Sequence, residues 1–271
     1  MKIFDTQAKF GKSTAILLSL ILFFLTIFLY FFTAHQRHKE NPDDKIVPTA
    51  SEMFNGLKRV TIQEDRKGEL RLWIDTFASG KRFLISLFFL VFAVILGLNM
   101  GVFPIIEHFF LRFMTFFDKI PALAVLPILF IIFGLGETSK IALILIGVFP
   151  TITLDTYLRA RSVPSEQITK GLTLGASDFE IAYKVVLPQI IPGVLDTIRL
   201  NFKAMILFLI AGESLAATVG LGYRIFVIRR YIAMDIIIPY VLWMSLLAFT
   251  ADLLVRLWVK NGYSWTEKQN G

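Results

Sequence analysis

The segment Gly171–Gly193, GLTLGASDFEIAYKVVLPQIIPG, interrupts a chain that is otherwise rich in leucine, isoleucine and phenylalanine. It has glycines near its start and prolines near its end, and these residue types favour turns and helix ends. Read as a helix, residues 178–187 place Phe179, Ala182 and Val186 on one side and the charged residues mostly elsewhere. The pattern predicts a short amphipathic helix along a membrane surface, shaped for contact with another protein.

The composition of the chain is that of a membrane protein. Of its 271 residues, 55% are hydrophobic and 14% are aromatic. Several runs reach the roughly 20 apolar residues that cross a bilayer. The chain has no cysteine, which excludes disulfides and thiolate metal sites. Its net charge of +7 fits basic residues that flank membrane spans, so no nucleic-acid partner is expected.

The apolar runs predict an all-α membrane protein with six transmembrane helices. The first run, residues 13–33, follows a basic N-terminus at 1–12 and is too long for the apolar core of a signal peptide. We therefore expect a retained anchor helix. A polar loop at 34–82 follows it, with a short amphipathic helix over 51–60 and no chemistry of its own. The other spans are expected near 83–101, 105–133, 141–158, 190–217 and 236–259, within a core of 83–259.

The distribution of Lys and Arg predicts the orientation of these spans. With the N-terminus inside, the short inner segments carry more Lys and Arg than the short outer loops, as the positive-inside rule requires. The N-terminus 1–12, the polar loop 159–189 and the tail 260–271 are then cytoplasmic, and loop 34–82 is periplasmic. The basic stretch Arg224–Arg230 runs against the rule.

Residues 169–188, TKGLTLGASDFEIAYKVVLP, resemble the cytoplasmic loop of the permease subunits of binding-protein-dependent ABC importers. The pattern of that family is Glu-Ala-Ala, three residues, Gly, nine residues, Ile, one residue and Leu-Pro. Gly175 takes the Gly position, Val185 takes the Ile position, and Leu187 and Pro188 close the motif. Thr169-Lys170-Gly171 replaces Glu-Ala-Ala, so one polar contact to the ATPase loses its carboxylate while the shape of the loop is retained.

The resemblance extends over about residues 83–259 and implies the type I ABC importer permease fold. Residues 118–157 and 211–226 are very similar to the nitrate, sulfonate and taurine-type permeases. Residues 40–48 and 229–243 resemble a urea-carboxylase-related branch of that group.

The family implies a mechanism in which the loop docks, as a coupling helix, on a separate ATP-binding subunit of the bacterial inner membrane transporter. ATP and magnesium belong to that subunit, a periplasmic solute-binding protein delivers the solute, and a second permease copy completes the pathway. This chain is not expected to be an enzyme or to bind a cofactor, because it holds no complete Walker motif. The residues expected at the coupling contact are Gly171, Gly175, Ala176, Ser177, Asp178, Glu180, Val185, Leu187 and Pro188.

Polar residues within spans suggest further sites. A charge inside a membrane is costly and by default indicates function, so Glu213 is a candidate for the translocation pathway or gate. The alternative is that Glu213 bonds to a neighbouring helix for structure alone. Asn99 is a weaker candidate near the end of its span. No metal site is expected, because His35 and His38 have no further ligand at suitable spacing.

The sequence leaves the solute and the mode of transport open. Nitrate, sulfonates or taurine, and urea-like or guanidine-like compounds all remain possible solutes. An ion-coupled secondary transporter is the alternative function. The sequence argues against it, because the spans contain few acidic residues and no inverted repeat is visible. A membrane-embedded enzyme would need converging catalytic groups, and the spans offer isolated carboxylates.

Overall fold

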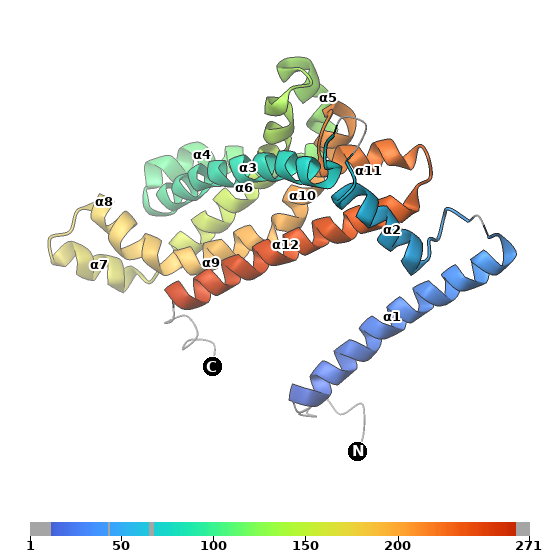
Figure 1. Ribbon diagram of the computed structural model, residues 1–271. Coiled ribbons are helices and arrows are strands. Elements are labelled where there is room, and N and C mark those ends of the chain that lie inside the picture. The colour runs from blue at the N-terminus through green and yellow to red at the C-terminus, as the bar shows by residue number, and fades with distance from the viewer. Residues whose placement is uncertain (1–11, 43, 65–67, 264–271) are drawn as a thin grey trace.

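A computed structural model of the chain describes residues 12–42, 44–64 and 68–263. These residues form helices and no strand, which confirms the predicted all-α fold (Figure 1). Five of the described helices are long and apolar enough to cross a membrane, and the number rises to seven if each of two bent helix pairs counts as one span. The predicted count of six lies within this range.

The predicted anchor forms part of the first helix, α1 (Lys12–Glu40). Figure 1 shows α1 set apart from the other long helices, and most of its described side chains are exposed. An apolar helix with so few buried side chains is suited to a lipid environment. The expected cytoplasmic N-terminus at 1–12 lies, except for Lys12, outside the described residues.

A short connection ties α1 to the next helix, α2 (Ala50–Thr61). The Tyr30 hydroxyl donates to the carbonyl of Pro48 over 3.1 Å. Arg37 donates to the Asp44 carboxylate over 2.5 Å, and this hydrogen bond holds the pKa of Asp44 below its usual value. The amphipathic helix expected over 51–60 is thus confirmed as α2 and is linked to the anchor.

The third helix, α3 (Arg71–Val102), corrects the expected boundary at residue 83. Its first turns were expected to belong to the polar loop 34–82, a segment rich in Lys, Arg, Asp and Glu. Three polar residues of that segment, Asp75, Ser79 and Arg82, lie in these turns. All three side chains are buried, and each has a hydrogen-bond partner within the protein. Polar residues satisfied in this way do not interrupt a spanning helix.

The expected third span is a bent pair, formed by α4 (Pro104–Asp118) and α5 (Ala122–Phe133). Their axes differ by 102°. Pro121 lies between them as the N-cap of α5. Proline disfavours helical geometry in the residue before it, which accounts for the break at Ile120.

The sixth helix, α6 (Glu137–Arg161), packs closely along α3. Gly97 and Gly101 of α3 make this approach possible. A Cβ at Gly97 would lie 2.7 Å from the Cβ of Thr156, and one at Gly101 would lie 3.1 Å from the carbonyl oxygen of Tyr157. Small residues at this four-residue spacing let membrane helices pack backbone against backbone.

The last third of the chain contains α9 (Leu187–Leu200), α10 (Phe202–Ala216), α11 (Leu221–Arg229) and α12 (Met234–Gly262). The single span expected at 190–217 is therefore divided at Asn201. The axes of α10 and α11 differ by 56°. Of the expected tail at 260–271, the first residues continue α12, and 264–271 lie outside the described residues.

The main core lies where α3, α6, α9 and α10 meet. Leu98, Ile152 and Met205 are fully buried there. The short helices α7 and α8 lie at one end of the molecule, and α2 and α11 lie at the other (Figure 1). Because α3 runs between these ends, it contacts both regions discussed below.

Candidate functional site: the coupling segment and the buried polar cluster

We name residues 165–188 the coupling segment. It consists of α7 (Ser165–Thr173), the single turn α8 (Asp178–Glu180), the π-helix η1 (Ile181–Val186) and the first residues of α9. The short amphipathic helix over 178–187 was expected from the sequence, together with glycine-favoured turns near the start of the segment. The π-helix was not.

The turn between the two pieces depends on Gly175. Its φ is +87°, a conformation that other residues rarely adopt. The N–H of Gly175 donates to the carbonyl of Leu172 over 3.0 Å, and the N–H of Ala176 donates to the carbonyl of Gly171 over 3.1 Å. This pair of bonds is the Schellman motif that ends α7. No atom lies within 4 Å of a Cβ added at Gly175, so backbone conformation alone selects glycine there.

A capping box starts the second piece immediately after this turn. The Ser177 hydroxyl accepts from the Glu180 N–H over 3.3 Å, and the Glu180 carboxylate accepts from the Ser177 N–H over 3.1 Å. Lys184 then donates to Glu180 over 2.7 Å. These reciprocal bonds satisfy donors that a helix start leaves unpaired. The angle between the two pieces is thus fixed by local contacts.

The π-helix directly precedes Pro188. Proline has no N–H and its ring collides with the carbonyl four residues earlier, here that of Lys184. A wider turn relieves this conflict, and the N–H of Leu187 accordingly donates to the carbonyl of Ala182, five residues back. π-helices are rare and frequently lie at functional sites.

The coupling segment presents two different faces. Ile181, Ala182 and Val186 are at most 1% exposed and pack into the main core or against it. On the other face Leu174 is 88% exposed and Phe179 is 63% exposed. Large apolar side chains held outward by a rigid backbone are typical of a surface that another protein covers.

The predicted coupling residues divide between these faces. Val185 and Leu187 are half-buried against the core, whereas Ser177 and Asp178 are exposed. A Cβ at Gly171 would meet the terminal methyl of Ile181, so α7 packs closely against η1 at this position.

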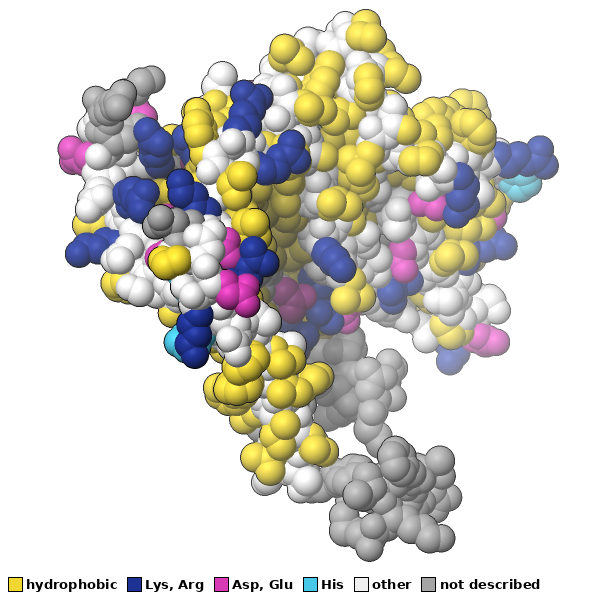
Figure 2. All heavy atoms as spheres, turned by 90° about the vertical axis from the view of Figure 1, so that its right-hand side faces the viewer, with side chains coloured by type: hydrophobic (Ala, Val, Ile, Leu, Met, Phe, Trp, Pro, Cys, Tyr) yellow, Lys and Arg dark blue, Asp and Glu magenta, His cyan; other side chains and the backbone are white. Residues whose placement is uncertain are grey.

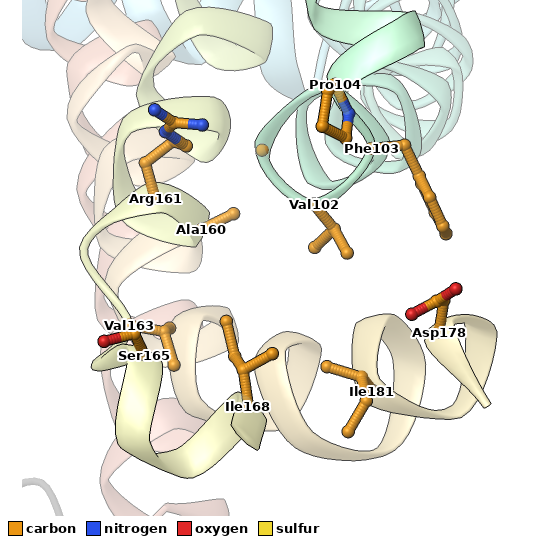
Figure 3. A pocket seen from close by; sticks show the side chains of 11 residues that line it. Val102, Phe103, Pro104, Ala160, Arg161, Val163, Ser165, Ile168, Asp178 and Ile181 are labelled. Atoms are coloured by element: carbon orange, nitrogen blue, oxygen red, sulfur yellow. The ribbon is translucent and has the colours of Figure 1, made fainter. Parts of the chain in front are cut away.

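A cavity of about 400 Å³ lies between the coupling segment and the turn from α3 to α4. Figure 3 shows Ile181 and Asp178 on one side of it and Val102 and Phe103 on the other. The coupling segment is therefore not packed against α3 along its whole length.

Asn99 contacts the coupling segment from α3. Its side-chain amide donates to the Tyr183 hydroxyl over 2.8 Å and to the carbonyl of Ile95 over 2.7 Å. The sequence suggested Asn99 and Glu213 together for the pathway. The structure instead places them near opposite ends of α3.

Glu213 lies in a second polar site, fully buried at the far end of α3. Its Oε1 accepts from the Ser79 hydroxyl over 2.7 Å and from Arg82 Nη1 over 2.6 Å. Its Oε2 accepts from the N–H of Gly222 over 2.8 Å. Both carboxylate oxygens are therefore satisfied by protein groups.

Arg82 connects Glu213 to α6. Its Nε and Nη2 donate to the two oxygens of Glu137 over 2.5 Å and 2.9 Å, and Nη1 also donates to the carbonyl of Val219 over 2.9 Å. Lys140 donates to Glu137 over 3.0 Å. A forked contact of this kind uses the planar geometry of the guanidinium.

Asp75 completes the site by binding the start of α11. It accepts from the N–H of Gly220 over 2.9 Å, from Arg224 Nε over 2.7 Å and from the Tyr240 hydroxyl over 3.2 Å. The next amide, that of Leu221, donates to Ser79 over 2.8 Å. Carboxylates at a helix N-terminus are favoured by the helix dipole.

We name these side chains the buried polar cluster; Glu137 lies at its edge, with its side chain 57% exposed. Its charges balance, because three anions face three cations. Ion pairing of this kind offsets the large cost of burying charge. The members are Asp75, Ser79, Arg82, Glu137, Lys140, Glu213, Arg224 and Tyr240.

Sequence reasoning found Glu213 but missed its partners. One signal was available, since Asp75, Ser79 and Arg82 have the spacing of one helix face. Arg224 was noticed as an exception to the charge rule, and its ion pair with Asp75 accounts for its position. Among the described residues no group of acidic, His or Cys side chains could hold a metal ion.

The chain matches a known family over most of its length. The family described as binding-protein-dependent transport system inner membrane component matches residues 90–261. The taurine transport system permease protein TauC of Escherichia coli (strain K12) is 31% identical over 186 residues, which cover 68% of each chain. A protein of that strain described as an aliphatic sulfonates transport permease, SsuC, is 28% identical over 146 residues, 52% of this chain and 56% of its own length.

A second organism provides a further relative. An ABC transporter permease-like protein of Methanocaldococcus jannaschii is 32% identical over 194 residues, 70% of this chain and 72% of its own length. These matches confirm the resemblance drawn from the loop motif. The chain belongs to the inner membrane components of binding-protein-dependent transport systems, the permease subunits of ABC importers.

Proposed function

We propose that this chain forms the pathway of an ATP-driven importer for a small sulfonate-like solute and that the coupling segment docks on a separate ATP-binding subunit. The observation that carries the proposal is the outward face of that segment. Leu174 and Phe179 are exposed on a backbone fixed by a Schellman turn and a capping box. Such a surface can transmit movement of the ATP-binding subunit to the permease, because its backbone resists deformation.

The family relationship supports the expected partners. Permeases of this family work with an ATP-binding subunit and a solute-binding protein, so ATP and magnesium belong to the former and this chain needs no cofactor. We place the coupling segment and both termini in the cytoplasm. A second copy of the chain would complete the pathway.

The opposite end of the molecule is then the periplasmic side, where the solute-binding protein docks. Figure 2 looks onto this end and shows Lys and Arg side chains among apolar ones. Arg59 of α2 is exposed, and so are Arg229 at the end of α11 and Arg230 directly after it. Basic side chains near an entrance raise the local concentration of anions, which suits a sulfonate.

The names of the relatives support the solute class. The chain is similar to proteins described as taurine and aliphatic sulfonates permeases. Uptake of taurine, ethanesulfonate, nitrate, urea and guanidine into vesicles would separate the candidates. We expect uptake of the sulfonates, and uptake of urea or guanidine alone would contradict this assignment.

We further propose that Glu213 acts in the gate through the position of α11. The buried polar cluster binds the first amides of α11 to Asp75 and Ser79 of α3 and to Glu213 of α10. A carboxylate with every oxygen already bound is better suited to fix a helix than to bind solute. The alternation of such a permease between two states would then include movement at the bend between α10 and α11.

The coupling role can be tested by purification from membranes in mild detergent. An ATP-binding subunit should copurify with the wild-type chain and hydrolyse ATP. Gly175→Val should remove ATP-driven uptake while the permease remains inserted, because a β-branched residue resists the required φ. Val60→Ala in α2, away from the coupling segment, should leave that subunit bound. A wild-type chain that purifies without any ATPase would overturn the proposed function.

A further inference from the structure

The contact between Asn99 and Tyr183 has a role that the family relationship does not assign. We propose that this hydrogen bond positions the coupling segment on α3, so that the segment and α3 move as one body when the ATP-binding subunit moves. The inference rests on the proposed coupling function and names the residues that carry its motion inward. Asn99 and Tyr183 act here as positioning residues.

The geometry of the pair is restrained on both sides. The Asn99 amide donates to Tyr183 over 2.8 Å and also to the carbonyl of Ile95 in its own helix. The Tyr183 ring lies against the Phe179 ring, with centroids 4.4 Å apart and planes inclined by 30°. The exposed Phe179 is thereby connected through Tyr183 to Asn99 and α3.

The packing around the coupling segment is incomplete, so the hydrogen bond between Asn99 and Tyr183 contributes to holding it on α3. The cavity of about 400 Å³ separates Asp178 from Val102 and Phe103. The buried contacts of Ile181 and Ala182 hold η1 to the core, but apolar contacts have no preferred direction. A hydrogen bond is directional, so the Asn99–Tyr183 bond can fix the rotation of the segment about its own axis.

The π-helix gives a reason why Tyr183 faces α3. A π-turn contains one more residue than an α-turn, and Tyr183 lies within it. The wider turn therefore changes the direction of the side chains that follow Glu180. Since Pro188 accounts for the π-turn, the Leu-Pro end of the family motif also sets the direction of Tyr183.

Movement of the coupling segment would be passed along α3 to the buried polar cluster. α3 is a single helix of 32 residues. Near its N-terminal end α3 carries Asp75, Ser79 and Arg82. These residues bind the start of α11 and the carboxylate of Glu213. Rotation or displacement imposed at Tyr183 would thus arrive at the bend between α10 and α11.

The test uses the complete transporter in detergent and in proteoliposomes. The chain has no cysteine, so a single cysteine at Phe77, exposed on the far part of α3, can carry an environment-sensitive fluorophore. ATP should change its fluorescence in the otherwise unaltered protein. In Tyr183→Phe and in Asn99→Leu we expect the equilibrium constant of this conformational change to fall roughly fivefold, about the effect of one lost hydrogen bond, and the fluorescence change to fall with it, while ATP hydrolysis persists.

The double variant and a matched control make the test specific. If the two residues act as one link, the double variant should lose no more than either single variant. Tyr157→Phe is the control, because the Tyr157 hydroxyl donates to Glu107 over 2.6 Å at the same end of the molecule without touching the coupling segment. It should keep the full ATP-driven change.

Each remaining outcome has a defined meaning. A full fluorescence change in Tyr183→Phe, with ATPase activity retained, would overturn the positioning role and leave the proposed function intact. An equal loss of the fluorescence change in Tyr157→Phe would also overturn it, because the effect would then not be specific to the hydrogen bond between Asn99 and Tyr183. Absence of an ATPase from the wild-type preparation would overturn the proposed function itself and this inference with it.

Discussion

The coupling segment and the buried polar cluster lie near opposite ends of α3 and are built in opposite ways. The coupling segment keeps its charges in water and takes its shape from bonds between residues close in sequence, such as Ser177 and Glu180. The buried polar cluster, apart from the exposed Glu137, is shielded from water and joins residues as far apart as Asp75 and Arg224. The first can therefore meet a partner as a preformed surface, whereas the second holds helices of the same chain together.

This difference predicts how each region responds to substitution. Loss of a buried ion-pair partner, such as Arg82 beside Glu213, leaves a charge buried without its partner, which is strongly destabilising. Loss of one bond in the coupling segment exposes its former partner to water at low cost. The stability of the permease should therefore depend on the cluster, and its coupling to ATP on the segment.

Arg82→Ala should have the largest effect. It leaves Glu137 with one of its two cations and Glu213 without its cation. We expect a loss of about 3–5 kcal/mol in the free energy of unfolding, measured by thermal unfolding in detergent. Arg59→Ala is the control, because its pair with Asp235 is 3.5 Å long and its side chain is 57% exposed. Equal effects of the two variants would contradict the comparison.

Gly220→Ala should rank second. The φ of Gly220 is +142°, and a Cβ there would lie 2.6 Å from the Glu213 carboxylate carbon. We expect a cost of about 2–4 kcal/mol from strain and overpacking together. Gly175→Ala meets open space and should cost only about 1–2 kcal/mol for its backbone conformation. Chemical unfolding of the two variants checks this order.

Glu213→Gln should have a smaller effect on stability. The substituted amide keeps the shape of the side chain but removes the charge that pairs with Arg82, and one of its N–H groups would face a donor. We expect a loss of about 1–3 kcal/mol and reduced uptake, with the ATP-binding subunit still bound. Unchanged uptake kinetics would remove Glu213 from the gate.

The two regions were also unequally predictable from the sequence. The turn at Gly175, the start of a helix after Ser177 and its end near Pro188 are local signals, so the shape of the coupling segment could be predicted. Glu213 was noticed as an intramembrane charge, but no local pattern names a partner 131 residues away in the chain. Long-range pairing needs the fold.

Two elements of the fold were missed for related reasons. The start of α3 at Arg71 was hidden because hydropathy counts Asp75 and Arg82 as polar wherever they lie, although both are buried. The π-helix arises from the conflict between Pro188 and the preceding turn. The hydrophobic periodicity of a sequence assumes a regular α-helix, so it could not predict a single wider turn.

Ser177→Ala should have the smallest effect on stability and gives the sharpest comparison. The same capping box occurs twice, at Ser177 with Glu180 and at Thr49 with Glu52, and in both the hydroxyl accepts over 3.3 Å. Each alanine substitution should cost about 1 kcal/mol.

Only Ser177→Ala, however, should weaken binding of the ATP-binding subunit, by roughly fivefold if the cost is paid on docking. Thr49→Ala removes an equal bond at the far end of the molecule and should leave that binding unchanged. Titration of the purified subunit against each variant measures both values. Equal weakening by the two variants would mean that general stability, and not the preformed shape of the coupling segment, determines docking.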